Sequence, residues 1–246
     1  MEYFLYLFGF LPSIIWLIFY LRKDKRPEPN KIVILCFFGG IASAFLVILP
    51  ELFWQEVVIA PLRENKKLLF LFLNLFIGAG LFEEYGKYLG AKFTAFKKSE
   101  LDEPIDVILY MIISALGFAA LENIFVLKTS IEPFVEMLSP PEALKTAIIN
   151  AIFRFPTSTF LHAIASGIFG YFLVLWFLKN KKRFFYYGLS LAFVLHGTYN
   201  YIIEILAKDS LSLRGFLKIC FFLTTGAVIL GFLIKKAKKL KSICQI

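Results

Sequence analysis

The stretch LFEEYGKYLG, residues 81–90, lies inside an apolar segment that begins at Leu68. It therefore places Glu83, Glu84 and Lys87 where a lipid-embedded helix should carry no charge, and each ionised group at that depth costs at least ~2.5–3.5 kcal/mol. Glu83 and Lys87 are four residues apart, so they can form an ion pair on one helix face. This pairing leaves Glu84, about 100° further round the helix, without a partner. We therefore expect the cluster to belong to a functional site.

The composition is that of a membrane protein. Of the 246 residues, 59% are hydrophobic and 30 are Phe, whereas a soluble domain is about 45–50% apolar. The net charge of +9 does not indicate nucleic-acid binding, because the Lys and Arg residues lie in short clusters at the ends of apolar runs. Cys36, Cys220 and Cys244 have neither metal-site nor disulfide spacing. The expected partner is the lipid bilayer, with no nucleic acid.

Apolar runs long enough to cross ~30 Å of hydrocarbon predict an all-α polytopic bundle of about seven transmembrane helices. Their ranges are approximately 3–21, 32–50, 68–96, 105–127, 146–178, 184–206 and 215–234. The first run has no basic segment before it, so we expect an uncleaved anchor. Residues 51–67 are expected to lie along the membrane interface. No segment resembles a separate soluble domain, so residues 1–246 are expected to form one integral membrane domain.

The distribution of basic residues predicts the orientation of the bundle. The loops at 22–31, 92–103, 179–183 and 235–241 carry 17 Lys and Arg residues together, and the loops on the other side carry 7. The positive-inside rule then places the N-terminus outside and the C-terminal tail in the cytoplasm. The expected location is the cell membrane.

Other polar residues stand inside the predicted helices. The two histidines of the chain, His162 and His196, both lie in apolar runs. Arg154, Ser158 and His162 follow one another at intervals of four, so they are expected to share one face of the fifth helix. His196 and Asn200 are also four apart, and Asn200 is expected either to orient the imidazole or to bond a neighbouring helix.

The depth of these residues can be counted from the helix ends. Glu83, Glu122, His162 and His196 stand 13 to 17 residues from the ends that face the basic side, which corresponds to roughly 20–25 Å along each axis. Four helices thus bring ionisable groups to one level, near or slightly outward of the midplane. Asn123 follows Glu122 at the same depth. Independent ion pairs have no reason to converge in this way, so we expect one polar site.

Buried glutamates and imidazoles suit the activation of water. A glutamate can accept a proton from water, and a histidine or Arg154 can stabilise the oxyanion of a tetrahedral intermediate. Arg154 can alternatively hold Glu84 charged. The same carboxylates and imidazoles are ordinary zinc ligands, and the candidate ligands are Glu83, Glu122, His162 and His196. No HExxH motif is present, so the sequence leaves open whether the cofactor is Zn²⁺ or none.

Several short motifs, taken in order, resemble those of the PrsW family of intramembrane proteases, within the wider group that includes CAAX-prenyl endopeptidases. They are Asp24 with Pro27-Glu28-Pro29, Glu83-Glu84-x-x-Lys87, Glu103-Pro104-x-Asp106, Gly117-Phe118-Ala119-x-x-Glu122-Asn123, Arg154 with His162 and Gly167, and His196-Gly197-x-x-Asn200. The resemblance covers most of the chain. Asp106 is separately expected to act as an anion at a helix start.

The resemblance implies hydrolysis of a peptide bond within or near the membrane. Glu83 would be the general base, supported by Glu84, and His162 and His196 would bind the oxyanion or a metal. Lys87, Asn123 and Arg154 would support the site, with Glu122 and Asn200 among its catalytic residues. The wider group has a histidine where this chain has Glu122. The implied substrate is a membrane-anchored protein, with site-1-type cleavage of an anti-sigma-factor-like protein as one case.

Two other classes of function also fit the buried polar residues. A proton- or cation-coupled transporter uses buried Glu and His to relay protons, although no inverted repeat or pair of broken helices is evident. A non-catalytic scaffold that binds transmembrane helices would use the cluster to join helices. Loss of Glu83 would stop cleavage in a protease, ion flux in a transporter, and mainly lower stability in a scaffold.

Overall fold

The computed structural model describes residues 2–23, 26, 28–96, 101–131, 140–208 and 213–240, and these contain helices and no strand. The helices are α1 (Glu2–Leu21), α2 (Asn30–Phe53), α3 (Leu62–Asn65), α4 (Lys67–Leu73), α5 (Phe82–Thr94), α6 (Pro104–Ile131), α7 (Pro140–Arg154), α8 (Ser158–Lys179), α9 (Arg183–Lys208) and α10 (Leu213–Ala237). Two π-helical segments continue α2 and α4: η1 (Trp54–Val58) and η2 (Asn74–Leu81). The predicted all-α class is confirmed.

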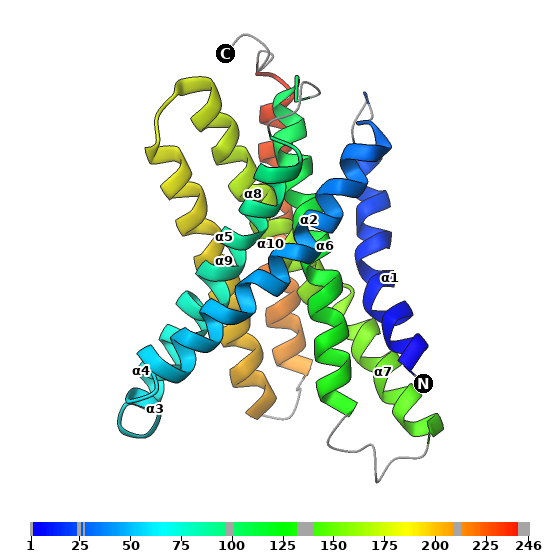
Figure 1. Ribbon diagram of the computed structural model, residues 1–246, viewed down its shortest axis with the longest axis vertical. Coiled ribbons are helices and arrows are strands. Elements are labelled where there is room, and N and C mark those ends of the chain that lie inside the picture. The colour runs from blue at the N-terminus through cyan, green and yellow to red at the C-terminus, as the bar shows by residue number, and fades with distance from the viewer. Residues whose placement is uncertain are drawn as a thin grey trace.

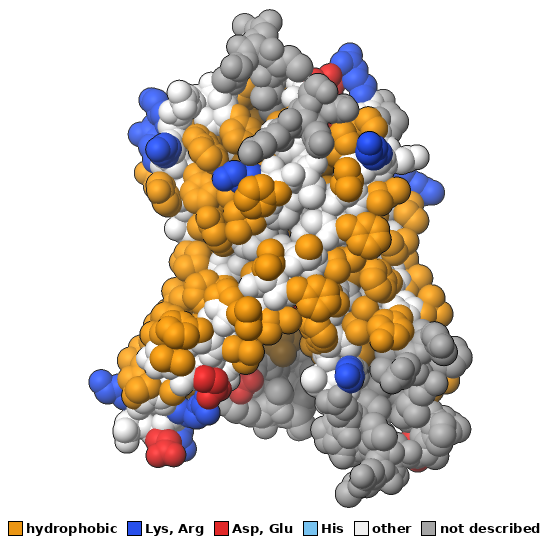
Figure 2. Space-filling view, in the orientation of Figure 1, with side chains coloured by type: hydrophobic (Ala, Val, Ile, Leu, Met, Phe, Trp, Pro, Cys, Tyr) orange, Lys and Arg blue, Asp and Glu red, His pale blue; other side chains and the backbone are white. Residues whose placement is uncertain are grey.

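Five stretches of the described chain are long and apolar enough to cross a membrane: Asn30–Val58, Lys67–Thr94, Pro104–Thr129, Leu144–Lys179 and Arg214–Ala237. A shorter apolar helix covers Tyr6–Leu21. Figure 2 shows hydrophobic side chains across the middle of the molecule, with charged side chains gathered toward its two ends. This arrangement is typical of a helical bundle that crosses a bilayer.

Helix α6 is the centre of the bundle and packs against α1, α2 and α8 (Figure 1). The most apolar 18-residue segment of α6 is entirely buried, whereas only 22% of the corresponding segment of α10 is buried. A helix that is apolar on all sides is suited to such a central position. Glu122 is on α6, so this carboxylate is carried by the helix that the others surround.

Two glycines allow α2 to approach α6 closely. A Cβ atom added at Gly40 would run into the backbone carbonyl of Ser114, and one added at Gly117 would run into that of Phe37. Small residues at such crossings let two backbones approach and gain packing contacts in a membrane. The close approach fixes α6 relative to α2, and α5 packs on both.

The third predicted helix, 68–96, is present but changes its geometry along its length. It runs as α4, the π-helical segment η2, and α5, and the change from π to α geometry comes at Phe82, directly before Glu83. π-helical turns within α-helices are rare and often lie at functional sites. The wider turn alters which face of the helix Glu83 and Glu84 occupy, relative to a regular α-helix from Leu68.

The fifth predicted helix, 146–178, was wrong as a single helix. The structure has two helices, α7 and α8, separated at residues 155–157. Pro156 explains the break, because proline lacks an N–H and disfavours a helical conformation of the residue before it. The indole N–H of Trp16 donates to the carbonyl oxygen of Phe155 at 2.8 Å. Arg154 therefore ends one helix, whereas Ser158 begins the helix that carries His162, so the three residues do not share one continuous helix face.

The start of α6 is held by Asp106, as expected for an anion at a helix start. Its Oδ2 atom accepts hydrogen bonds from the backbone N–H groups of Asp102 at 3.2 Å and Glu103 at 2.6 Å. The Tyr110 hydroxyl, one turn further along, donates to Glu28. The motif residues Asp24 and Pro27 lie outside the described residues, as do residues 132–139 of the loop expected at 128–145, whose two ends belong to α6 and α7.

Candidate active site

The acidic pair on α5 shares one lysine. The ammonium group of Lys87 lies 2.7 Å from Oε1 of Glu84 and 3.2 Å from Oε2 of Glu83. It also lies 4.5 Å from the centre of the Phe118 ring, whose π face attracts a cation. Lys87 and Glu84 are fully buried, and the side chain of Glu83 is 10% exposed. Glu83 is therefore the carboxylate of the pair that water can reach.

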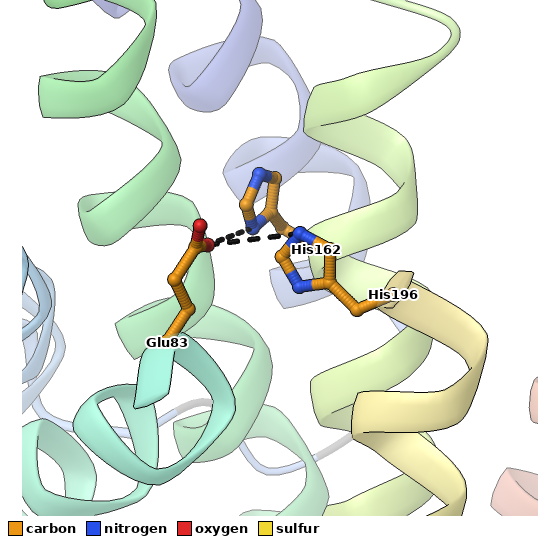
Figure 3. Close-up of side chains that lie close together, drawn as sticks. All are labelled: Glu83, His162 and His196. Carbon is orange, nitrogen blue, oxygen red and sulfur yellow. Dashed lines mark ion pairs between the residues drawn. The ribbon is translucent and has the colours of Figure 1, made fainter. Parts of the chain in front are cut away.

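Both histidines face Glu83 from neighbouring helices, as Figure 3 shows. Nδ1 of His162, on α8, lies 3.9 Å from Oε2 of Glu83, and Nε2 of His196, on α9, lies 3.7 Å from the same oxygen. The two imidazole rings meet edge to face, with centroids 4.9 Å apart. The convergence that depth counting predicts is therefore confirmed for these three side chains, from three separate elements.

Each imidazole has a second carboxylate against its other ring nitrogen. Nδ1 of His196 lies 3.0 Å from Oε1 of Glu84, and Nε2 of His162 lies 2.7 Å from Oε2 of Glu122. The second contact is short but not aligned as a hydrogen bond, so it is an electrostatic contact in this structure. A carboxylate behind a histidine fixes the orientation of the ring and its tautomer. Both rings thus present their remaining nitrogen to Glu83.

Glu122 is in turn held by a polar network. Arg154 lies 3.1 Å from its Oε1 atom and donates from Nε to Oδ1 of Asn123 at 2.6 Å. The amide of Asn123 donates to the hydroxyl of Thr159 and to the backbone oxygen of Gly9. The end of α7, the start of α8 and helix α1 are therefore tied to α6 beside the histidines.

The expectation that Glu84 lacks a partner was wrong. It accepts hydrogen bonds from Lys87 at 2.7 Å and from the Ser166 hydroxyl at 2.7 Å, in addition to its contact with His196. A helix seen alone gives only the partners within it, whereas two of these three come from α8 and α9. Glu84 is thus the most completely bonded carboxylate of the cluster.

Two expected contacts are replaced by others. Arg154 pairs with Glu122 and not with Glu84. In the described structure Asn200 makes no hydrogen bond to His196, whose two ring nitrogens lie against Glu84 and Glu83. Asn200 is one turn from His196 on α9, so its assignment to the site stays a prediction.

Sequence reasoning missed two residues near the site. Ser166 stands four residues after His162 on the same helix face, and this spacing is the signal that could have indicated it. Glu51 lies near the end of α2, and it interacts electrostatically with Glu122 and Lys87. Its Oε1 atom is buried and has no hydrogen-bond partner among the described residues. The sequence interpretation placed it in an interfacial segment.

The donor set fits a zinc ion. Glu83, His162 and His196 offer ligand atoms that all lie within 4.8 Å of one another, and the ligands of a tetrahedral zinc lie about 3.3 Å apart. Nδ1 of His162 is buried with no hydrogen-bond partner in the described structure, as a ligand atom would be. Glu122 lies behind His162 and is not a member of this group. Lys87 is the competing cation, at 3.2 Å from Glu83.

Known proteins resemble this chain over most of its length. A family model described as PrsW family intramembrane metalloprotease matches residues 28–231. A protein named Protease PrsW from Geobacillus kaustophilus is 32% identical over 195 residues, covering 78% of this chain and 74% of that protein. Those of Oceanobacillus iheyensis and Bacillus subtilis are each 29% identical, and they cover 85% and 96% of this chain and 87% and 94% of their own lengths. No solved structure matches.

The family match covers well over half of the chain, including all the helices that carry the candidate site. With its several membrane-length apolar helices, the chain is a multi-pass protein of the cell membrane, and the match favours proteolysis over transport or scaffolding. The chain belongs to the PrsW family of intramembrane metalloproteases.

Proposed function

We propose that this chain is an endopeptidase that hydrolyses a peptide bond of a membrane-anchored protein, with Glu83, His162 and His196 as its reaction centre. One observation carries the proposal. Each imidazole has a carboxylate at one ring nitrogen and turns the other toward Glu83. This arrangement directs three donor atoms from three helices to one point deep in the bundle.

The orientation of the rings favours zinc at that point. A charged carboxylate only accepts hydrogen bonds, so the N–H of each neutral imidazole belongs on the side of Glu84 or Glu122. The nitrogens that face Glu83 then carry lone pairs, and so does the carboxylate oxygen between them. Three converging lone pairs repel one another unless a cation lies among them. His162, His196 and Glu83 would therefore hold the zinc ion.

The charges of the cluster also accommodate a divalent cation. Three carboxylates, from Glu83, Glu84 and Glu122, stand against the two permanent cations of Lys87 and Arg154. These five groups together leave one negative charge in excess in a region where unpaired charge is costly. Lys87 lies closer to Glu84 than to Glu83, so it can keep its stronger partner when an ion occupies the other side of Glu83.

A zinc ion held there would act as a Lewis acid and lower the pKa of a bound water, so that the water is nucleophilic at neutral pH. Oε2 of Glu83 would face the metal together with the two histidines, and its other carboxylate oxygen would accept the proton of the attacking water and deliver it to the amine that leaves. Glu84 holds the ring of His196, and Glu122, held by Arg154, holds that of His162. Lys87 pairs with both glutamates and holds them in place on α5.

A glutamate-type mechanism without metal is the alternative, and the contact of Lys87 with Glu83 favours it. In that version Lys87 is the cation at the centre. His162 and His196 are protonated, and they donate hydrogen bonds to the oxyanion of the tetrahedral intermediate. Glu83 activates the water in both versions.

Metal analysis distinguishes the two versions. Zinc would be measured by mass spectrometry in the purified wild type and in His162→Ala, with chelator-treated samples assayed on a membrane-anchored peptide. Ser43→Ala is the matched control, because its buried hydroxyl bonds only to Gly40 in its own helix. We expect one zinc per chain in the wild type and the control, none in His162→Ala, and cleavage that a chelator stops.

Two other results would change the conclusion. Cleavage that resists chelators, needs Glu83 and occurs without zinc would assign the glutamate-type mechanism. If no membrane-anchored peptide is cleaved by a folded, zinc-loaded wild type, the proposed protease reaction itself is wrong.

We also propose that the chain forms one membrane domain of seven crossings, with α1 and α9 joining the five longer spans. In Figure 1 the start of α1 and the end of α10 lie toward opposite ends of the bundle, which supports an odd number of crossings. The excess of basic residues at the C-terminal end supports a cytoplasmic C-terminus. Cysteine-labelling from each side of the membrane, at introduced sites near residues 64 and 181, tests this orientation.

The proposed substrate is a protein anchored in the same membrane and cut near the outer half of the bilayer, with an anti-sigma-factor-like protein as the candidate. The depth of Glu83 along α5 supports cleavage at that level. Mass-spectrometric mapping of the cut in a model substrate with a single transmembrane helix tests it. A cut on the cytoplasmic side would contradict the proposed position.

A further inference from the structure

A groove of about 630 Å³ lies between α1, α8 and α10, away from the reaction centre. Its walls are apolar and include Ile15, Phe19, Phe160, Ala227, Leu230 and Ile234. Its volume is within the ~300–1,000 Å³ usual for ligand sites. None of the residues at the reaction centre lines it, so the proposed proteolysis leaves this groove without a role.

Three lysines line one end of the groove: Lys23, Lys235 and Lys238. The ammonium group of Lys238 donates to the backbone oxygen of Lys23 at 2.6 Å, and that of Lys23 lies 4.4 Å from the centre of the Phe19 ring. The end of α1 is thereby joined to the end of α10. No acidic side chain is among the described residues that line the groove. Its charged end is therefore complementary to an anion.

The length of the groove matches half of a bilayer. From Lys23 to Ile15 along α1, and from Lys238 to Ala227 along α10, the rise per residue gives about 12–16 Å. The hydrocarbon core of a bilayer is ~30 Å thick, so one leaflet accounts for about half of that. In Figure 1 the C-terminal ends of α1 and α10 both lie at the upper end of the bundle.

We propose that this groove binds an anionic phospholipid of the leaflet on the C-terminal side. Its phosphate lies among Lys23, Lys235 and Lys238, and one acyl chain lies along the apolar wall between α1 and α10. Basic clusters at the ends of transmembrane helices attract anionic headgroups by about 1 kcal/mol per lysine. The lysine-lined end of the groove is suited to a phosphate headgroup, and its apolar wall is suited to an acyl chain. Both features therefore favour an anionic phospholipid.

A substrate helix suits the groove less well. Under the positive-inside rule a transmembrane helix carries its own Lys and Arg at the cytoplasmic end. In the proposed orientation those residues would meet the three lysines of this chain, and like charges in contact oppose binding. A lipid phosphate meets the same lysines with the opposite charge.

Gly231 on α10 allows the groove to be filled without disturbing the bundle. It lines the groove, and a Cβ atom added there meets no heavy atom of the described structure within 4 Å. Gly231→Phe places a ring where the acyl chain would lie. Gly231→Ala is the matched control, because it changes the same position and leaves most of the space open.

The experiment uses the full-length protein in a neutral detergent. Phosphatidylglycerol and phosphatidylcholine with the same acyl chains are titrated separately, and bound lipid is measured by native mass spectrometry. The variants are Gly231→Phe, Gly231→Ala and the triple variant Lys23→Gln, Lys235→Gln, Lys238→Gln. Thermal unfolding and zinc content show which variants are folded.

We expect the wild type and Gly231→Ala to retain phosphatidylglycerol and to bind phosphatidylcholine at least tenfold more weakly. The triple variant should bind phosphatidylglycerol on the order of 100-fold more weakly, at about fivefold per lysine. Gly231→Phe should lower the affinity at least tenfold. Equal binding of both lipids, or unchanged phosphatidylglycerol binding in the folded triple variant or in folded Gly231→Phe, would overturn the proposal. If Gly231→Phe does not fold, the triple variant decides alone.

Discussion

The variant Glu84→Gln tests whether Glu84 and the adjacent Glu83 have different roles. The Glu84 side chain is fully buried and accepts from Lys87, Ser166 and His196 at 2.7, 2.7 and 3.0 Å. Glutamine keeps the shape of the side chain and removes its charge. A hydrogen bond to a charged group contributes ~1.5–3 kcal/mol, and a neutral one ~0.5–1.5 kcal/mol. The three bonds together therefore lose about 3 kcal/mol.

A second estimate gives a similar magnitude. Removal of one partner of a buried ion pair destabilises a protein by ~3–5 kcal/mol, because the other charge is left uncompensated. Here Lys87 keeps Glu83 at 3.2 Å, which reduces the loss. We expect Glu84→Gln to lower the free energy of unfolding by about 2–4 kcal/mol, measured by denaturant unfolding of the purified protein in detergent.

The same substitution should weaken zinc binding. Nδ1 of His196 loses its charged partner, and loss of such a partner lowers metal affinity by ~10–100-fold. A competition titration between the protein and a chromophoric chelator measures this affinity. Cleavage by Glu84→Gln should be low at limiting zinc and should recover in part when zinc is added in excess.

Glu83→Gln and Ser166→Ala are the matched comparisons. Glu83 contacts its cation at 3.2 Å and is partly exposed, so Glu83→Gln should abolish cleavage with a smaller loss of stability. Ser166→Ala removes one hydrogen bond to Glu84 and should lower stability by about 1–3 kcal/mol. The reasoning is refuted if Glu84→Gln keeps the stability and zinc affinity of the wild type, or if Glu83→Gln is the more destabilised of the pair.

Three further outcomes follow from the same contacts. Glu122→Gln removes the charge behind His162, so chelator competition should show ~10–100-fold weaker zinc binding; unchanged affinity would exclude Glu122 as its support. Gly117→Ala should lower the free energy of unfolding by ~1–3 kcal/mol, because the added methyl group would contact Phe37. The control Gly231→Ala should stay within ~0.5 kcal/mol of the wild type. Equal effects of the two variants would contradict the close crossing of α2 and α6. Zinc at 1,000 times its dissociation constant should stabilise the wild type by about 4 kcal/mol in thermal unfolding with and without chelator. That increment should be absent from His162→Ala.

The sequence predicted the convergence of the site because the relevant quantities are local. The depth of a residue depends only on its distance from the helix end, and both histidines stand at the depth of Glu83. Helical spacing predicts that Glu83 and Lys87 share one helix face, and the structure contains the ion pair between them. Glu83 and Glu84 indicate a site because an ionised side chain inside an apolar run is energetically costly.

Other features depend on how helices are rotated against one another, and a single sequence does not contain that rotation. Glu84 obtains two of its three partners from α8 and α9. The break at residues 155–157 turns Arg154 toward Glu122, although the spacing to His162 suggests one continuous face. Pro156 indicated the break locally, but the surrounding apolar run was read as one span. The π-helical turn before Glu83 has no sequence signal of comparable strength.

The arrangement also explains how the bundle tolerates so many buried charges. At the edge of the cluster two carboxylates have a close opposite charge, with Lys87 beside Glu84 and Arg154 beside Glu122. The pairing is incomplete toward the centre, where Glu83 has one cation at 3.2 Å and Nδ1 of His162 has no hydrogen-bond partner among the described residues. A buried polar atom without a hydrogen-bond partner lowers the stability of the protein unless a ligand binds to it. The two paired carboxylates therefore hold Glu83 and His162 in place. The space between Glu83 and His162 is where an ion, a water molecule and a peptide carbonyl would lie during hydrolysis.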